Sequence, residues 1–269
     1  MQKEKYDAKR YISASQLQMF ENCGEQYYRR YILKEKIPPG IALLKGSGVH
    51  GAAKANFRQK VESHQDLPNK DIVEIAVTEF ERTFSNQGVL LTPEEETVGL
   101  KNVLGETKDS VSRLADLYAV EIAPAYQPVF VEESYRVVID NSPYDLLAVM
   151  DWADDQDRVV DLKTGSKSKT QRDVDTSEQL TFYALVYMAK VKRLPKEVRL
   201  ETLVDTKVPK VQTLSSVRDN GDLLALVARI NTMIQGLAKG VFIPAQPASW
   251  VCDPRYCGYY QTCKYVSAT

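Results

Sequence analysis

The sequence predicts an α/β protein in which a mixed central β-sheet is flanked by helices. Three observations predict this class: helical periodicity dominates the first half, strand-like segments begin near residue 128, and a capped helix separates two groups of strands. Of the 269 residues, 43% are hydrophobic and 26% charged, which is typical of a globular protein that buries a large core. We therefore expect one domain over residues 1–269.

Residues 1–125 are expected to be mainly helical. In ISASQLQMFENCGEQYYRRYIL, Ser13 and Gln16 have the spacing of a capping box, and Gly24 predicts a break in the helix. A second helix is predicted in KGSGVHGAAKANFRQKVES, with His50 in its first turn. Residues 69–123 then carry helical periodicity with a break at Pro93, which predicts a helical insertion.

Residues 126–218 are expected to form the α/β core. Three strands, VFVEESYRVVID, YDLLAVMDWADD and RVVDLKTG, are separated by short turns and predict a meander. The helix DTSEQLTFYALVYMAKVK follows, then the strands VRLETLVDT and KVQTLSSV. Residues 219–269 add the helix GDLLALVARINTMIQGLAKG and a cysteine-rich C-terminal segment.

Charged residues gather at the ends of two neighbouring predicted strands. A hairpin would bring Asp151 and Asp161 to one end of the sheet, where a divalent cation such as Mg²⁺ or Mn²⁺ would relieve their repulsion. Because side chains alternate along a strand, Lys163 faces the same way as Asp161. A metal beside an ammonium suits phosphodiester hydrolysis. The local alternatives are a surface ion pair for Asp161 and Lys163, and a structural helix-terminal role for His50.

The four cysteines are distributed unevenly along the chain. Cys23 lies near the start, and Cys252, Cys257 and Cys263 lie within the last eighteen residues. Closely spaced thiols in a reducing compartment more often bind metal than form disulfides, so Cys23 would join the C-terminal segment to the first helix. Four thiolates also satisfy a structural zinc site, and unrelated buried thiols are the simplest alternative.

Six segments together resemble the RecB-like branch of the PD-(D/E)XK nuclease superfamily. This branch includes the CRISPR-associated exonucleases and the AddB-type nuclease domains with an iron-sulfur cluster. The similarity extends over most of the chain, and its segments are ISASQLQMFENCGEQYY, GSGVHGAAK, AVMDWADD, VVDLKTG, EQLTFY and CDPRYCGYYQTC.

The resemblance implies a restriction-endonuclease-like core and a role for particular residues. Lys163 would act on the attacking water or the scissile phosphate, and Glu132 would be a supporting acid. Gln179 and Tyr183, four apart on one helix face, would orient DNA or the lysine. The implied metal ligands are His50, Asp151, Asp161 and the Leu162 carbonyl; the implied ligands of a 4Fe-4S cluster are Cys23, Cys252, Cys257 and Cys263.

The expected partner is DNA that is single-stranded or has free ends. The formal net charge is only −1, so affinity must come from local cations, and Lys167, Lys169 and Arg172 follow the proposed catalytic strand directly. No phosphate loop is present, so no nucleotide cofactor is expected, and unwinding would need a separate helicase. CRISPR adaptation proteins are another possible partner. Without a signal or membrane-spanning segment, we expect a cytoplasmic protein.

Taken together, the sequence predicts a Mg²⁺- or Mn²⁺-dependent deoxyribonuclease, and more specifically an exonuclease. It would serve DNA recombination, repair, phage metabolism or CRISPR adaptation. The alternative is a noncatalytic DNA-binding scaffold subunit of a nuclease or helicase complex. Having His50, Asp151, Asp161 and Lys163 together favours catalysis, since a scaffold needs no such set.

Overall fold

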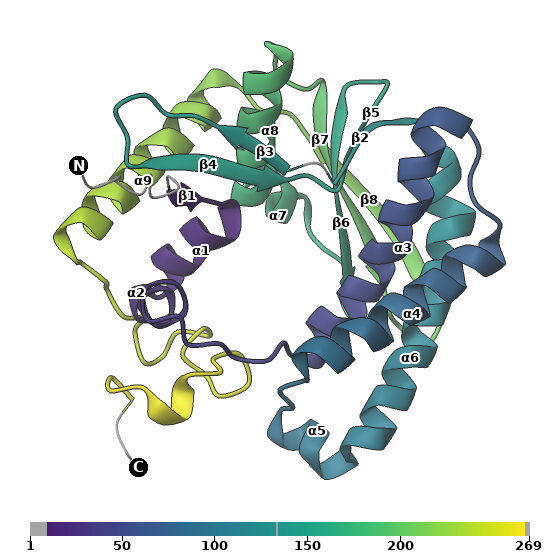
Figure 1. Cartoon of the computed structure of the whole chain (residues 1–269), viewed down its shortest axis with the longest axis horizontal. Helices are drawn as coiled ribbons and strands as arrows, with labels where there is room; N and C mark the ends of the chain where they lie inside the picture. The colour runs from purple at the N-terminus through teal and green to yellow at the C-terminus, as the bar shows by residue number, and fades with distance from the viewer. Residues whose placement is uncertain (1–9, 133, 267–269) are drawn as a thin grey trace, which may run out of the picture.

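Two mixed β-sheets with helices on both sides form the structure, a computed structural model that describes residues 10–132 and 134–266 (Figure 1). The sheet orders are β1-β4-β3 and β2-β5-β6-β7-β8. The predicted α/β class is confirmed. The strands are β1 (Arg10–Ile12), β2 (Pro128–Val131), β3 (Ser134–Val137), β4 (Tyr144–Val149), β5 (Trp152–Asp154), β6 (Arg158–Gly165), β7 (Glu197–Val204) and β8 (Lys210–Ser216).

The antiparallel meander is present, but two of its three predicted strands are each divided between the sheets. The first becomes β2 and β3 and the second becomes β4 and β5, with breaks after Val131 and Val149. β3 pairs with β4 in the small sheet, whereas β2 pairs with β5 in the large one. Periodicity missed the breaks because each half keeps a strand-like alternation.

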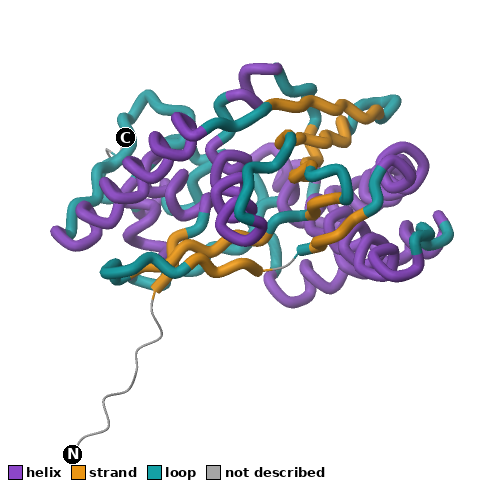
Figure 2. The backbone as a smooth tube through the Cα atoms, turned by 90° about the horizontal axis from the view of Figure 1, so that it is seen from above, coloured by secondary structure: helices purple, strands orange, loops and turns teal. Residues whose placement is uncertain are grey.

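The helices lie at both ends of the molecule with the strands between them (Figure 2). α3, α4 and α6 pack on one side, and α1, α8 and α9 on the other (Figure 1). The predicted helical insertion and the break at Gly24 are confirmed. The helices are α1 (Ala14–Asn22), α2 (Gly24–Tyr27), α3 (Ile41–Ser63), α4 (Asn69–Gln87), α5 (Pro93–Val98), α6 (Leu100–Leu117), α7 (Gln171–Asp175), α8 (Glu178–Val191) and α9 (Asn220–Lys239).

Helix α3 begins earlier than predicted. It starts at Ile41, so His50 lies in the third turn and the prediction of a first-turn histidine was wrong. Gly46 and Gly48, before His50, both lie within this helix. A Cβ atom on Gly48 would lie 2.7 Å from the Ala76 carbonyl oxygen, so this glycine permits close packing of α3 on α4.

Two hydrophobic cores lie on the two faces of β6. Val159 packs in the core shared with α1, α8 and α9, whereas Val160 and Leu162 pack in the core shared with α3, α4 and α6. The strand therefore presents alternate side chains to two sets of helices. Residues near the C-terminal end of β6 can consequently meet groups that arrive from either side.

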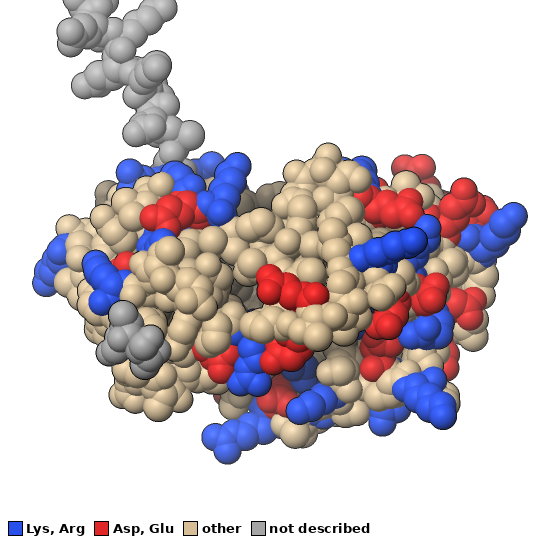
Figure 3. Space-filling model, turned by 90° about the horizontal axis from the view of Figure 1, so that it is seen from below, with Lys and Arg blue, Asp and Glu red and all other residues tan. Residues whose placement is uncertain are grey.

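Acidic and basic side chains are interspersed on the surface instead of gathering by sign (Figure 3). On the face shown, both kinds cover the helical insertion, at the right of the view. Any attraction for a polyanion must therefore arise from local groups. Among the described helices, none combines the length and the apolar character that crossing a bilayer requires.

The packing of α3 against α4 predicts opposite effects of one substitution at two helical glycines. Gly105→Ala, in α6, places its methyl group in open space and should stabilise the protein by up to about 1 kcal/mol. Gly48→Ala forces a methyl group against the α4 backbone and should destabilise it by about 1–3 kcal/mol. Urea denaturation of both variants measures the difference; equal midpoint shifts would contradict the close packing.

Candidate functional site

The two strand breaks lie side by side at one point between the sheets. Glu132 follows β2, and Asp151 precedes β5. The Glu132 backbone N–H donates to the Asp151 carbonyl oxygen at 2.9 Å, and this hydrogen bond joins the two strand breaks. Glu132 has a φ of 39°, in the left-handed region that non-glycine residues seldom adopt. Backbone of this kind often occurs at functional sites.

Asp151 also completes the hydrogen bonding of β6. β5 pairs with β6 only at Trp152 and Ala153, opposite Val160 and Val159. Past that point the Leu162 N–H donates to the Asp151 Oδ2 atom at 2.7 Å. One carboxylate oxygen therefore fixes the side chain to the strand. The other oxygen faces His50.

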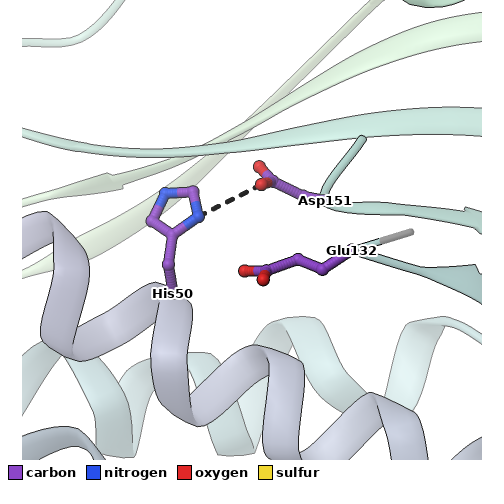
Figure 4. A group of neighbouring side chains, drawn as sticks. All are labelled: His50, Glu132 and Asp151. Carbon is purple, nitrogen blue, oxygen red and sulfur yellow. Dashed lines mark ion pairs between the residues drawn. The ribbon is translucent and has the colours of Figure 1, made fainter. Parts of the chain in front are cut away.

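His50 reaches the strand breaks from α3 (Figure 4). Its Nδ1 atom lies 3.2 Å from the Asp151 Oδ1 atom, and Glu132 points toward the same place. Potential ligand atoms of His50, Glu132 and Asp151 all lie within 4.8 Å of one another. An imidazole nitrogen with two carboxylate oxygens suits a divalent cation such as Mn²⁺ or Mg²⁺. The side chains of this group therefore fit the metal that the sequence predicted.

Asp161 and Lys163 lie together on the neighbouring strand. The Lys163 Nζ atom is 2.9 Å from the Asp161 Oδ2 atom, as expected for residues on one face of a strand. Asp161 is not a member of the three-residue group within 4.8 Å, a place that Glu132 takes among the described residues. Its predicted metal ligation, like that of the Leu162 carbonyl, stays a prediction.

The charges of the site influence one another strongly. Burial alone would lower the pKa of His50, but the Asp151 carboxylate raises it to about 9. Burial would raise the pKa of Asp151, yet His50 holds it below its usual value. Burial raises the pKa of Asp161 to about 6 against the opposing effect of Lys163. Asp161 is thus close enough for its charge to affect the pKa of His50.

A further cation, which the sequence analysis did not identify, contacts the site. The Lys54 Nζ atom lies 2.5 Å from the Glu132 Oε2 atom. Lys54 is four residues after His50 on α3, so the two side chains project from one helix face. That spacing was a usable signal, since it places a lysine one turn from a predicted ligand.

The predicted glutamine and tyrosine pair is formed on α8. The Gln179 Nε2 atom donates to the Tyr183 hydroxyl at 2.7 Å. Burial raises the pKa of Tyr183, and the Asp161 and Asp151 carboxylates raise it further. The phenol is therefore close enough to these two carboxylates to feel their charge. Gln179 lines the same cavity as Asp161 and Lys163.

This cavity, of about 710 Å³, also contains two of the three predicted DNA-binding cations. Lys167 and Lys169 line it, whereas Arg172 lies on α7 outside it. Gln212 exchanges two hydrogen bonds with the Lys169 backbone, at 2.7 and 2.9 Å, and so fixes the segment after β6. Glu21, Asp173 and Glu178 line the cavity as well, so its charge is mixed.

The four cysteines converge although up to 240 positions separate them in sequence. Cys23, Cys252, Cys257 and Cys263 all line one small cavity between α2 and the C-terminal segment, and all four are free thiols. Burial raises the pKa of Cys252, with added contributions from Cys263 and Cys23. The four thiols therefore lie around one cavity, and their role as metal ligands stays a prediction.

A hydrogen bond to one of the cysteine sulfur atoms is a feature that metal-thiolate sites share. The Ala245 N–H donates to the Cys23 Sγ atom at 3.4 Å. Burial raises the pKa of the Cys257 thiol, and the Tyr259 backbone and Gln26 act against this effect. Hydrogen bonds to sulfur stabilise thiolates that hold zinc or an iron-sulfur cluster. Gly24 permits the approach, since a Cβ atom there would lie 2.5 Å from the Ile243 nitrogen.

Comparison with known proteins identifies a family. The family model described as "PD-(D/E)XK nuclease superfamily" matches residues 11–264. No curated protein matches the chain. A crystal structure of a candidate exonuclease from Eubacterium rectale is similar at 12% identity and a TM-score of 0.58, covering 100% of this chain and 95% of that one.

This structural similarity extends the agreement in fold to the whole chain. The structure of the protein SSO0001 aligns over 98% of this chain and 90% of its own, at 11% identity, with a TM-score of only 0.43.

Proposed function

The chain belongs to the PD-(D/E)XK nuclease superfamily, and from this premise we propose that it is a divalent-metal-dependent deoxyribonuclease acting on single strands or DNA ends. The observation that carries the proposal is the convergence of His50, Glu132 and Asp151 within 4.8 Å, beside Asp161 and Lys163. Exonuclease activity is the finer element of the proposal. It accords with the description of the structurally similar Eubacterium rectale protein.

His50, Asp151 and Glu132 would hold the cation, with Asp161 and the Leu162 carbonyl as the remaining predicted ligands. When bound, Mg²⁺ or Mn²⁺ would lower the pKa of a water molecule and draw negative charge from the phosphate. The Leu162 N–H holds the Oδ2 atom of Asp151, so the Oδ1 atom, which faces His50, keeps a defined direction. Rigid ligands of this kind preorganise a site for charge that develops during reaction.

Lys163 supplies a partly exposed positive charge in the proposed site. Its side chain is 39% exposed, whereas Asp161 beside it is almost fully buried. The ammonium can thus contact a phosphate in the cavity while Asp161 keeps it in place. Gln179 would orient the substrate or Lys163 from the wall of that cavity, and its hydrogen bond to Tyr183 limits its rotation.

Lys167 and Lys169 would bind phosphates of the strand beyond the reaction centre. Both line the cavity that contains Asp161 and Lys163. Arg172 lies outside this cavity on the same connecting segment, so its contact would be to a more distant phosphate.

For the cysteine group we propose a structural 4Fe-4S cluster, with zinc as the alternative metal. Its support is the convergence of four free thiols on one cavity and the Ala245 N–H directed at Cys23. A metal held there would connect α1 and α2 to the segment after α9. Its role would be to stabilise the fold, because the thiols line a different cavity from the acidic group.

The nuclease proposal predicts that labelled single-stranded DNA is digested with Mn²⁺ and not with EDTA. Asp161→Ala and Lys163→Ala should each lower the rate by about 100-fold or more, since each removes charge stabilisation at the reaction centre. Asp109→Ala and Lys101→Ala, on exposed positions of α6, are the matched controls and should cleave normally.

Substrates blocked at one end then test the exonuclease assignment. Digestion that requires a free end supports it, and cuts within doubly blocked or circular DNA would contradict it. If the purified protein binds DNA but cleaves none with either metal, it is a noncatalytic scaffold and the enzyme proposal fails.

The cysteine proposal predicts a brown protein after anaerobic purification, with about four iron atoms and four sulfides per chain. Cys257→Ser should remove the colour and lower the thermal unfolding midpoint, because the link between the chain ends is lost. Tyr260→Phe lines the same cavity without a sulfur and should keep both. A colourless protein with one zinc per chain would replace the cluster by zinc.

A further inference from the structure

A groove beside α3 is lined by two of the proposed metal ligands, His50 and Glu132, and Lys163 lies outside its lining. Its volume is about 480 Å³, and one wall is a single face of α3 that carries Ser47, His50, Gly51, Lys54 and Arg58. These positions recur every three or four residues, as one face of a helix requires. The opposite wall comes from α4 and from Glu132.

The groove adjoins the proposed metal ligands His50, Glu132 and Asp151. His50, Lys54 and Glu132 line both the groove and a smaller cavity that contains Asp151 and Leu162. Asp161 and Lys163 open instead into the large cavity with Lys167 and Lys169. The reaction centre is therefore placed between two cavities, and both contain cations.

Cations on α3 form a row that leads away from His50. Lys54 follows His50 by one turn and Arg58 follows Lys54 by another, so each step is about 6 Å along the helix. This step is comparable to the spacing of successive phosphates in a nucleic acid strand. The Arg58 side chain is exposed, and among the described residues it forms no ion pair.

The other charges of the groove are balanced locally. Arg82 pairs with Glu79 on α4, and Lys54 pairs with Glu132. If Glu132 holds a cation, its charge is shared with the metal and the Lys54 ammonium becomes available to another anion. Lys54 would then join Arg58 as a cation directed at a polyanion in the groove.

We propose that this groove binds the phosphates of a single nucleic acid strand on the side of the scissile bond opposite Lys163, through Lys54 and Arg58. The proposal rests on the nuclease function given above. It adds a binding site for the part of the substrate strand that lies beyond the scissile bond from Lys167 and Lys169. The strand would contact Lys167 and Lys169 on one side of the centre and α3 on the other.

Binding can be tested apart from cleavage in an Asp161→Asn background, with fluorescein-labelled oligo(dT) and anisotropy as the readout. In this background Lys54→Ala combined with Arg58→Ala should weaken binding roughly tenfold or more at low salt. Between about 50 and about 200 mM KCl, the slope of log K against log salt should become shallower by about 1.4, because each phosphate contact to a single strand contributes about 0.7.

Lys101→Ala combined with Lys108→Ala is the matched control. It also removes two cations from one helix, and Lys108 is ion-paired as Lys54 is. The control should keep the wild-type slope. Lys54→Arg with Arg58→Lys should restore most of the affinity, and unchanged thermal unfolding midpoints verify that all variants are folded.

The dependence of affinity on oligonucleotide length distinguishes binding along the groove from general electrostatic attraction to the protein. Shortening oligo(dT) until it can no longer span both cavities should weaken binding to the Asp161→Asn protein but have little effect on the protein that also carries Lys54→Ala and Arg58→Ala. A variant with the control's affinity, slope and length dependence overturns the groove proposal and leaves the nuclease proposal intact. A wild-type protein that neither binds nor cleaves DNA overturns both.

Discussion

One backbone hydrogen bond, from the Glu132 N–H to the Asp151 carbonyl oxygen, joins the two places where the chain passes from one sheet to the other. Each of two long strands must turn there, and each turn exposes a carboxylate side chain that would otherwise lie within a ladder. The separation of β5 from β6 beyond Val160 leaves the Leu162 amide without a strand partner, which Asp151 supplies. The acidic group thus exists because the meander bends at this level.

The position of β6 between two cores explains why the site draws residues from distant segments of the chain. α3 approaches one face of this strand and α8 approaches the other, so His50 and Tyr183 reach the same carboxylates from opposite sides. Gly48 lets α3 pack closely on α4, which sets the position of the helix that carries His50. Packing far from the carboxylates therefore controls the geometry between them.

Much of this arrangement could be predicted from the sequence, but only where the signal was local. Alternation predicted Asp161 and Lys163 on one strand face, and the capping box at Ser13 and Gln16 is present. The breaks at Glu132 and Asp151 were not predicted, because they depend on pairing between strands and not on residue preference. The ion pair between Lys54 and Glu132 was also missed, because 78 positions separate these residues in sequence and only the fold brings them together.

The convergence of Cys23 with the segment around Cys252 to Cys263 makes assembly of the thiol group a late event in the life of the chain. A ribosome adds about 5–20 residues per second, so the first thiol is made tens of seconds before the last. Until residue 243 has been made, α1 and α2 lack the surface that Phe242 and Ile243 provide. The contacts of α1 and α2 with this segment, and the thiol group beside them, can therefore form only after most of the chain has been made.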